Sequence, residues 1–511
     1  MSDRVRKLIG IEAINAEREC WTGQDEVIAI IDSGIDPNHP DFGKDRVQTM
    51  VGVAGGRTDD IIGHGTHVAG IAAGDGTASD GRVRGMAPKA GLVVIGMTDD
   101  DARLMLPPDL GQLLNQAADA GARIINLSWD FPLASAYDSG SRSVDAFVRQ
   151  RPDVLVVVAA GNESEGAPDG YPYLYSMGTP ATAKNALTVG ACASDRPDIE
   201  LTWGQYNGTR FPTKPTAELS LAGDPTAVAA FSGRGPTDYQ SVKPDLVAPG
   251  TAILAARSSL APDSRFWRLP SEYKGKYTMM NGTSMAAPVV SGAAAVVRQY
   301  VRQHYNVTPS AALLKAILIA ATERLPWQRA DEARSKFGFP DFDQGFGRLD
   351  LRAVLPHPAA PPGRELFLED VADEEDKALE SRAPRGSVHQ AARRYRWTLA
   401  ESEAPLRIVL TWIDYHEAAV QNCLSIHLRG PAGILARGND QHRWQEVDPG
   451  LLSPKALAMA IDRRNSVQAV EVSPAPAGEY TLTITASNTL FPPQGYSLCV
   501  SGAFDERPTF S

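Results

Sequence analysis

Three residue types that together perform acyl transfer each lie in a glycine-flanked motif of this sequence. Ser284 lies in GTSMAAP, at the start of an apolar helical pattern that runs from Met285 to Val301. The free N–H groups at a helix start stabilise negative charge, which suits a nucleophile. His64 lies between two glycines in GHGTHVAG, and Asp32 follows the apolar run EVIAII. A serine needs a base, and an imidazole base needs an acceptor that fixes its tautomer, so we predict a nucleophile, a base and an orienting acid.

Each motif also has a structural interpretation when it is taken alone. Gly-Thr-Ser is common in turns and helix caps, and Asp-Ser-Gly after residue 31 opens turns well. His64 and His67 are three residues apart, but a His-x-x-His pair without a third ligand nearby is weak evidence for zinc. A general base is the better supported role for His64, because imidazole accepts protons near neutral pH.

Apolar runs and helical patterns alternate through the first part of the chain. We expect strands at 27–31, 92–95, 123–127 and 154–159, and helices at 110–120, 143–149 and 309–322. This alternation predicts a doubly wound parallel sheet of the α/β class. Asp32 and Asn162 would follow the carboxyl ends of strands, where α/β proteins build their sites. Asn162 could adopt a left-handed turn after Gly161, or hold its amide toward a reacting oxygen.

The composition changes after Leu355 and divides the chain. We predict a catalytic domain over 1–355, a linker with a solvated acidic run over 356–394, and an all-β jelly-roll or sandwich domain over 395–511. The linker carries PHPAAPPGR and EDVADEEDKALE, and the last part carries alternating runs such as LRIVLTW and GEYTLTIT.

Charge and hydropathy exclude several classes of protein. A net charge of −11 argues against nucleic-acid binding, and the absence of a long apolar run argues against a membrane partner. The N-terminal residues lack an apolar signal, so we expect a cytoplasmic protein if the chain is complete, and a secreted one if a leader was removed. The four cysteines are too widely spaced for a disulfide framework, so we expect free, mostly buried thiols: Cys20, Cys192, Cys423 and Cys499.

The motifs IIDSGID, GHGTHVAG, VAAGN and NGTSMAAP together resemble those of the subtilisin-like serine proteases, the subtilases. The resemblance implies that Asp32 is the orienting acid, His64 the general base and Ser284 the nucleophile. It also implies that the Asn162 side chain and the backbone N–H of Ser284 bind the oxyanion. FSGRGPT, KPDLVAPGT and QGFGRLD are similar to alkaline subtilases that carry a C-terminal jelly-roll domain.

The resemblance further implies a protein or peptide substrate that binds as an added strand. The residues expected to line its path are Ser128, Trp129, Asp130, Gly161 and Asp100. Asp130 stands where subtilases usually have a small glycine. Together with the acidic stretch 99–101 it predicts a mild preference for basic residues on the non-prime side, although that stretch could equally be a solvated turn.

No cofactor is expected for the chemistry, and no residue is assigned as a metal ligand. A structural calcium ion stays open, because subtilases often bind calcium and Asp41 in HPDF matches a calcium-ligand position. The stretch QNCLSI is less acidic than the corresponding site of jelly-roll relatives.

The sequence therefore predicts a monomeric serine endopeptidase that works through an acyl-enzyme. One alternative is a processing protease dedicated to a single intracellular partner. Another is a pseudo-protease that only binds, but this would require the loss of a catalytic residue. A third gives the main role to the C-terminal domain as an adhesin, in which Trp397, Trp412 and Trp444 would face a ligand. A domain that covers and stabilises the protease is the simpler interpretation.

Overall fold

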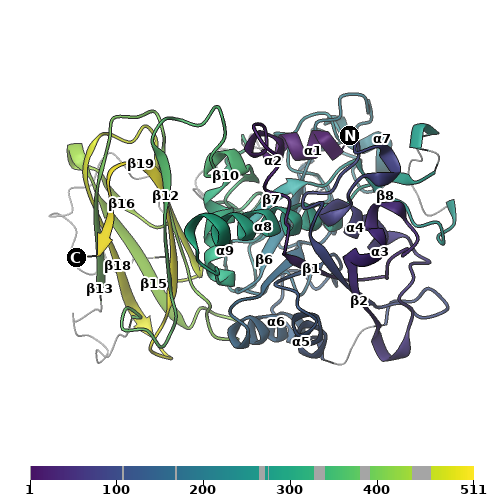
Figure 1. Ribbon diagram of the computed structural model, residues 1–511, viewed down its shortest axis with the longest axis horizontal. Coiled ribbons are helices and arrows are strands. Elements are labelled where there is room, and N and C mark those ends of the chain that lie inside the picture. Colours follow the sequence, from purple (N-terminus) through teal and green to yellow (C-terminus); the bar gives the residue numbers. More distant parts are fainter. Residues whose placement is uncertain are drawn as a thin grey trace.

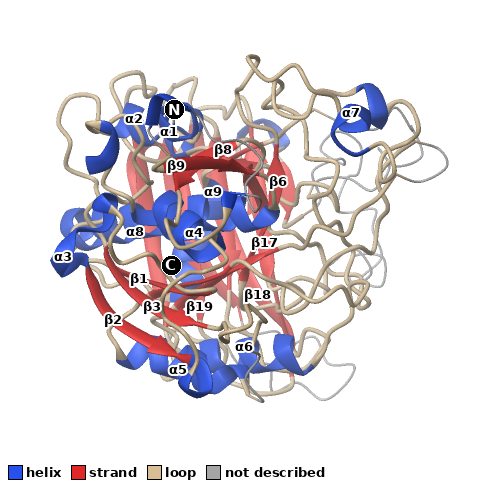
Figure 2. Ribbon diagram, turned by 90° about the vertical axis from the view of Figure 1, so that its right-hand side faces the viewer, coloured by secondary structure: helices blue, strands red, loops and turns tan. Residues whose placement is uncertain are grey.

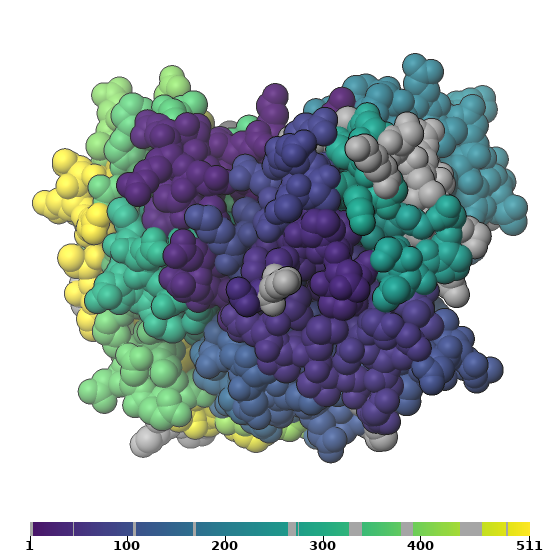
Figure 3. Space-filling view, turned by 45° about the vertical axis from the view of Figure 1, so that its right-hand side comes forward, coloured from purple at the N-terminus to yellow at the C-terminus, as the bar shows by residue number. Residues whose placement is uncertain are grey.

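The molecule consists of two domains that lie side by side (Figure 1). The structure is a computed structural model that describes residues 2–105, 109–166, 170–263, 271–273, 275–326, 340–379, 392–439 and 462–510. The N-terminal domain, up to residue 355, contains a sheet with helices on both faces, and the C-terminal domain, from residue 364, is built from strands. In the space-filling view, the yellow and light-green C-terminal domain lies at the left, beside the N-terminal domain (Figure 3).

A parallel sheet forms the centre of the N-terminal domain. Among the described residues it has nine strands in the order β10-β11-β7-β6-β5-β4-β1-β3-β2, and all neighbours except β10 and β11 run parallel. This confirms the predicted doubly wound α/β fold. The strands are β1 (Val27–Asp32), β2 (Val47–Gly52), β3 (Gly91–Gly96), β4 (Ile124–Leu127), β5 (Leu155–Ala159), β6 (Leu187–Cys192), β7 (Leu246–Pro249), β10 (Thr322–Glu323) and β11 (Arg348–Leu349). A separate hairpin joins β8 (Ile253–Ala256) to β9 (Tyr277–Met280).

Helices cover both faces of this sheet (Figure 2). The helices α4 and α8 pack against each other on one face, and α5 and α6 pack against each other on the opposite face. None of the described helices combines the length and the apolar character that crossing a membrane requires. The helices are α1 (Ser2–Leu8), α2 (Ile11–Ile14), α3 (Gly43–Arg46), α4 (His64–Ala73), α5 (Leu110–Asp119), α6 (Ser139–Gln150), α7 (Trp203–Asn207), α8 (Thr283–Tyr305) and α9 (Ala311–Ala320).

The C-terminal domain is all-β, as predicted, and every strand pairing in it is antiparallel. Its long strand β19 pairs with β12 and β14 through its first part and with β13 through its last part, so it joins two groups of strands. A buried core that includes Trp397 and Trp412 lies within this domain. The strands are β12 (Arg364–Val371), β13 (Ala392–Leu399), β14 (Leu406–Thr411), β15 (Asn422–Arg429), β16 (Leu435–Arg437), β17 (Val467–Val472), β18 (Gly478–Thr489) and β19 (Tyr496–Phe510).

The predicted linker 356–394 needs correction, because it contains β12 and the start of β13. Charged residues hide the alternation of RELFLEDV, yet Leu366 and Val371 of β12 are buried. Its acidic run is not simply solvated either, since Asp370 accepts hydrogen bonds from Ser310 N (2.8 Å) and Ser497 Oγ (2.6 Å). The finer jelly-roll topology stays a prediction. Trp397 and Trp412 belong to the core rather than to a ligand-binding surface, and Trp444 lies outside the described residues.

Helix α9 joins the hydrophobic cores of the two domains. Its sequence AALLKAILIA is apolar apart from Lys315, and all of its residues are buried. It packs against β5 of its own domain and against β14 and β19 of the C-terminal domain. As a result Val409 and Cys499 of the C-terminal domain belong to the same buried cluster as Leu314 and Ile317 of α9. The C-terminal domain therefore covers apolar surface that the N-terminal domain would otherwise expose.

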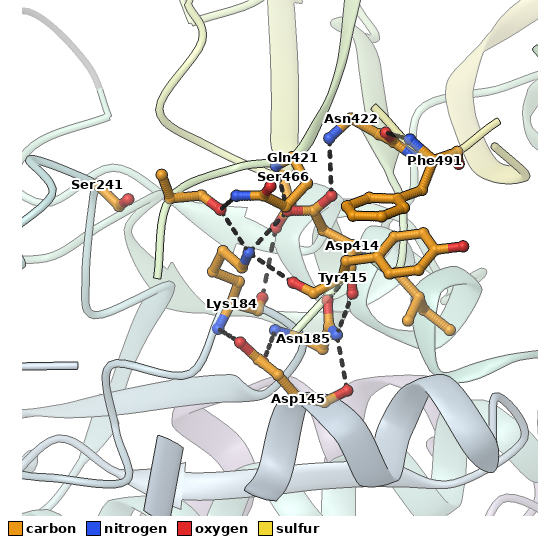
Figure 4. Close-up of polar contacts among 12 residues, drawn as sticks. Asp145, Lys184, Asn185, Ser241, Asp414, Tyr415, Gln421, Asn422, Ser466 and Phe491 are labelled. Atoms are coloured by element: carbon orange, nitrogen blue, oxygen red, sulfur yellow. Dashed lines mark hydrogen bonds and ion pairs between the residues drawn. The ribbon is translucent and has the colours of Figure 1, made fainter. Parts of the chain in front are cut away.

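A buried ion pair reinforces this junction (Figure 4). Lys184 Nζ donates to Asp414 Oδ2 (2.7 Å) and to the carbonyl oxygens of Tyr415 (2.7 Å) and Ala419 (2.8 Å). The neighbouring Asn185 exchanges two hydrogen bonds, both of 2.8 Å, with the backbone of Asp414. The side chains of Lys184 and Asp414 are 4% and 0% exposed. Removing one partner of such a pair typically costs about 3–5 kcal/mol, so these contacts oppose separation of the domains.

Candidate active site

Residues far apart in the sequence meet at the carboxyl edge of the parallel sheet. Asp32 is the last residue of β1, Ser128 follows β4, and Asn162 lies shortly beyond β5. These three strands are neighbours in the order β5-β4-β1. His64 is the first residue of α4, and Ser284 lies in the first turn of α8. The structure thus brings the four residues predicted for chemistry to one edge of the sheet.

His64 is held by Asp32 and by the backbone around it. His64 Nδ1 and Asp32 Oδ1 are 2.8 Å apart, which leaves Nε2 on the other side of the ring. The backbone geometry explains why glycine flanks His64 on both sides. Gly63 has φ 90°, and a Cβ on Gly65 would lie 2.2 Å from the Gly34 carbonyl oxygen. Burial opposes protonation of His64, but the nearby carboxylates of Asp32 and Asp60 outweigh it and raise its pKa above the usual 6.5.

Sequence analysis missed Asp60, which organises the turn that carries His64. Its Oδ1 accepts from Gly63 N (2.7 Å) and Ser33 Oγ (2.8 Å), and its Oδ2 accepts from Thr66 N (2.8 Å). The carboxylate is fully buried, and burial raises its pKa against the effect of these hydrogen bonds. Its only signal in the sequence is its position in DDIIGHG, just before the motif of His64.

The backbone of Ser284 is tied to the segment that follows β4. Ser284 Oγ donates to the Ser128 carbonyl oxygen (2.8 Å), and Ser128 Oγ donates to the Ser284 carbonyl oxygen (2.9 Å). Behind them, Asn126 Nδ2 donates to Ser128 Oγ (2.8 Å), and Ser291 Oγ donates to Asn126 Oδ1 (2.9 Å). Within the part of the chain that the structure describes, no hydrogen bond joins Ser284 to His64, so the hydroxyl must rotate before His64 can accept its proton.

The orientation of Asn162 is fixed through its side-chain oxygen. Asn162 Oδ1 accepts from Thr283 N (2.8 Å) and Thr283 Oγ1 (3.1 Å), so its NH₂ group points away from Thr283. The guanidinium group of Arg210 donates to the Asn162 carbonyl oxygen and to the Ser164 carbonyl oxygen. Arg210 comes from an irregular loop, and sequence analysis assigned it no role.

The surroundings of His67 do not fit a metal-ligand role, and those of Asp41 consist of protein hydrogen-bond donors. His67 is fully buried, its Nε2 lies 3.1 Å from the Ile253 carbonyl oxygen, and burial lowers its pKa to about 3. Asp41 Oδ1 and Oδ2 accept from Ala78 N (2.8 Å) and Tyr277 Oη (2.7 Å). Each carboxylate oxygen of Asp41 thus accepts one bond from a protein donor, and a structural calcium ion at this position stays an expectation.

Two of the residues predicted to line the substrate path, Trp129 and Asp100, contact other parts of the protein. Trp129 Nε1 donates to the Ile31 carbonyl oxygen (3.1 Å), which ties the segment after β4 to β1. Asp100 is 89% exposed and forms an ion pair with Arg57 (2.8 Å), while Asp101 pairs with Arg103 (2.9 Å). These arginines offset the negative charge that the stretch 99–101 was expected to supply.

Asp130 and Gly161 lie against each other instead. A Cβ on Gly161, the residue before Asn162, would lie 2.9 Å from Asp130 Oδ2. Sequence analysis placed both residues along the substrate path, and the structure brings them together next to Asn162.

Comparisons with known proteins agree with this arrangement. The model of the subtilase family matches residues 23–347. A serine protease/ABC transporter B family protein, tagA of Dictyostelium discoideum, is 24% identical over 94% of this chain and 30% of its own length. Serine protease AprX of Bacillus subtilis is 30% identical over 61% of this chain and 63% of its own length. The major intracellular serine protease of the same bacterium is 30% identical over 61% of this chain and 82% of its own length.

The family match covers more than half of the chain, from before β1 to the residue before β11. The tagA protein is considerably longer than this chain, which spans 30% of it, and the chain spans 63% of AprX. The motifs, the sheet and the family match all concern the same residues. The chain belongs to the subtilase family of peptidases.

Proposed function

We propose that this chain is a serine endopeptidase that hydrolyses peptide bonds through an acyl-enzyme on Ser284. The hydrogen bond between His64 Nδ1 and Asp32 Oδ1 carries this proposal, because it orients the ring and leaves Nε2 available as a base. Membership of the subtilase family supports the same chemistry.

The reaction begins when a substrate strand aligns with the segment after β4. A substrate N–H group that binds the Ser128 carbonyl oxygen replaces the Ser284 hydroxyl, which now donates there. The freed hydroxyl turns to His64 Nε2, which accepts its proton as Oγ attacks the scissile carbonyl carbon. The Asn162 NH₂ group and the Ser284 N–H bind the resulting oxyanion. The C–N bond breaks as His64 returns the proton to the leaving amine, and water then releases the acyl group by the same steps.

Two alternatives differ in what the enzyme cleaves, or whether it cleaves at all. A dedicated processing protease would cut few sequences in a peptide library, whereas a broad protease would cut many. A pseudo-protease would cut none, but every residue that the chemistry needs is present in this chain. A library cleavage profile of the pure protein separates the three.

A serine-directed fluorophosphonate tests the nucleophile directly. We expect a single adduct on Ser284, identified by mass spectrometry of the digested protein, together with loss of hydrolysis of unfolded casein. His64→Ala should label much more slowly, because the hydroxyl then lacks its base. An adduct on another residue, or hydrolysis that survives complete labelling of Ser284, would refute the assignment.

Activity should depend on pH through His64. The base must be neutral, so kcat/KM should rise with pH and remain high above the pKa of His64. Asp32 and Asp60 raise this pKa, so the midpoint should lie above the usual 6.5 of histidine. Initial rates at low substrate concentration across the range give the midpoint. A profile that falls as pH increases through neutrality would contradict a histidine base.

A further inference from the structure

Asp130 carries a carboxylate for which the structure gives no hydrogen-bond or ion-pair partner among the described residues. It lies on the segment after β4, two residues beyond Ser128, whose carbonyl oxygen accepts the bond from Ser284. The next residue, Phe131, exchanges hydrogen bonds of 3.0 and 2.9 Å with Thr179. The segment 128–131 therefore runs beside the segment 177–179.

Two glycines form the surface under this carboxylate. A Cβ on Gly178 would lie 2.2 Å from Asp130 Oδ2, and a Cβ on Gly161 would lie 2.9 Å from it. Gly178 N donates to the Ala160 carbonyl oxygen (3.0 Å), which closes the third side of the enclosure. The segments 128–131, 160–162 and 177–179 thus surround the Asp130 carboxylate, and the missing side chains of the glycines leave it room.

This enclosure adjoins the position of the reacting carbonyl group. Asn162 directly follows Gly161, and Ser284 contacts Ser128, so both groups that handle the scissile carbonyl stand at its rim. The substrate residue that contributes this carbonyl, the P1 residue, has its side chain next to the same rim. A long P1 side chain that enters the enclosure meets the Asp130 carboxylate.

The electrostatics of the enclosure favour a cation. Burial, together with the nearby carboxylate of Glu163, raises the pKa of Asp130 to about 6. The neighbouring guanidinium group of Arg210 donates to the carbonyl oxygens of Asn162 and Ser164 and lies 3.8 Å from Glu165. A half-buried carboxylate without a partner is unfavourable, and a guanidinium or ammonium group from the substrate relieves it.

We propose that Asp130 selects substrates with arginine or lysine at P1. This inference rests on the proposed peptidase function and names the substrate class of that site. The alternative is that the Asp130 side chain simply fills the space and admits only small P1 residues. In the first case the charge of the P1 side chain determines kcat/KM, and in the second its size does.

Matched peptides that carry arginine or citrulline at P1 isolate the charge, because these side chains have nearly the same shape. We expect kcat/KM at about pH 8 to be roughly 10- to 100-fold higher for arginine, as for a hydrogen bond between charged groups. In Asp130→Asn this ratio should fall to about twofold or less. Asp119→Asn, which removes an exposed carboxylate from α5, should keep the full ratio.

The pH dependence of the same ratio provides a second readout. Both peptides need neutral His64, so its titration cancels. The ratio should fall as pH decreases through about 6, because Asp130 takes up a proton there in the free enzyme.

Equal rates for arginine and citrulline peptides, with glycine or alanine preferred, would overturn the inference and leave the peptidase intact. Cleavage of no peptide, with no fluorophosphonate adduct on Ser284, would instead overturn the proposed function.

Discussion

Ser284→Ala should lose roughly 10⁶-fold in kcat, the magnitude found when the nucleophile of subtilisin is removed. The alanine variant has no hydroxyl to form the acyl-enzyme, while the oxyanion donors and the substrate path remain. A small residual rate above that of water is therefore expected. The measurement is hydrolysis of a fluorogenic peptide at saturating substrate, with the enzyme freed of contaminating proteases by affinity purification.

Two controls separate loss of the nucleophile from a general effect of mutation or from unfolding. Ser143→Ala changes a serine of α6, on the opposite face of the sheet, and should retain full activity. Thermal unfolding of Ser284→Ala should nearly match that of the unchanged protein, because among the described residues its side chain makes one hydrogen bond, to the Ser128 carbonyl oxygen. A variant that stays folded and hydrolyses peptides at the original rate would show that Ser284 is not the nucleophile.

Asn162→Ala should lose roughly 10²–10³-fold in kcat with little change in KM, the loss measured for an oxyanion donor of subtilisin. The side-chain oxygen of Asn162 is held by Thr283 N and Thr283 Oγ1, which leaves the NH₂ group to donate to the oxyanion. An interaction made only in the transition state affects kcat rather than KM. Steady-state kinetics with one peptide over a wide concentration range separate the two constants.

Thr283→Ala provides the graded comparison for Asn162. It removes one of the two bonds to Asn162 Oδ1 but keeps the backbone N–H that makes the shorter one (2.8 Å). Its loss in kcat should therefore be smaller than that of Asn162→Ala. If the whole loss of Asn162→Ala appeared in KM, then Asn162 would bind the ground state of the substrate and not the oxyanion.

The sequence was sufficient to predict the central sheet, because continuous apolar runs are typical of parallel strands that are covered on both faces. The run before Asp32 predicted a strand that the structure extends by one residue to Val27–Asp32. The helix expected at 143–149 begins earlier, at Ser139, because Asp138 caps it by accepting from Ser141 N. Such a cap precedes the apolar residues, so the helical spacing of those residues does not predict it.

The parts of the site that sequence analysis missed depend on contacts between distant segments. Asp60 accepts a hydrogen bond from the backbone next to His64, and Arg210 donates one to the backbone of Asn162. The spacing of these residues in the sequence does not predict either contact. The ion pair between Asp100 and Arg57 was not foreseen for the same reason, since the two residues lie on different segments. Strand β12 was missed because its charged residues, such as Asp370, which contacts Ser310, interrupt the apolar alternation.

The packing of α9 has a consequence for the order in which the chain can fold during synthesis. This helix is complete once residue 320 has left the ribosome, but β14 and β19, which cover its outer side, emerge much later. Until then the side of α9 that packs against β14 and β19 is not covered by these strands, and Lys184 lacks its ion-pair partner Asp414. The N-terminal domain, which contains all the proposed catalytic residues, therefore reaches its final stability only after β19 has been made. Synthesis of the covering strands thus delays the appearance of a fully stable N-terminal domain until the chain has been made through β19.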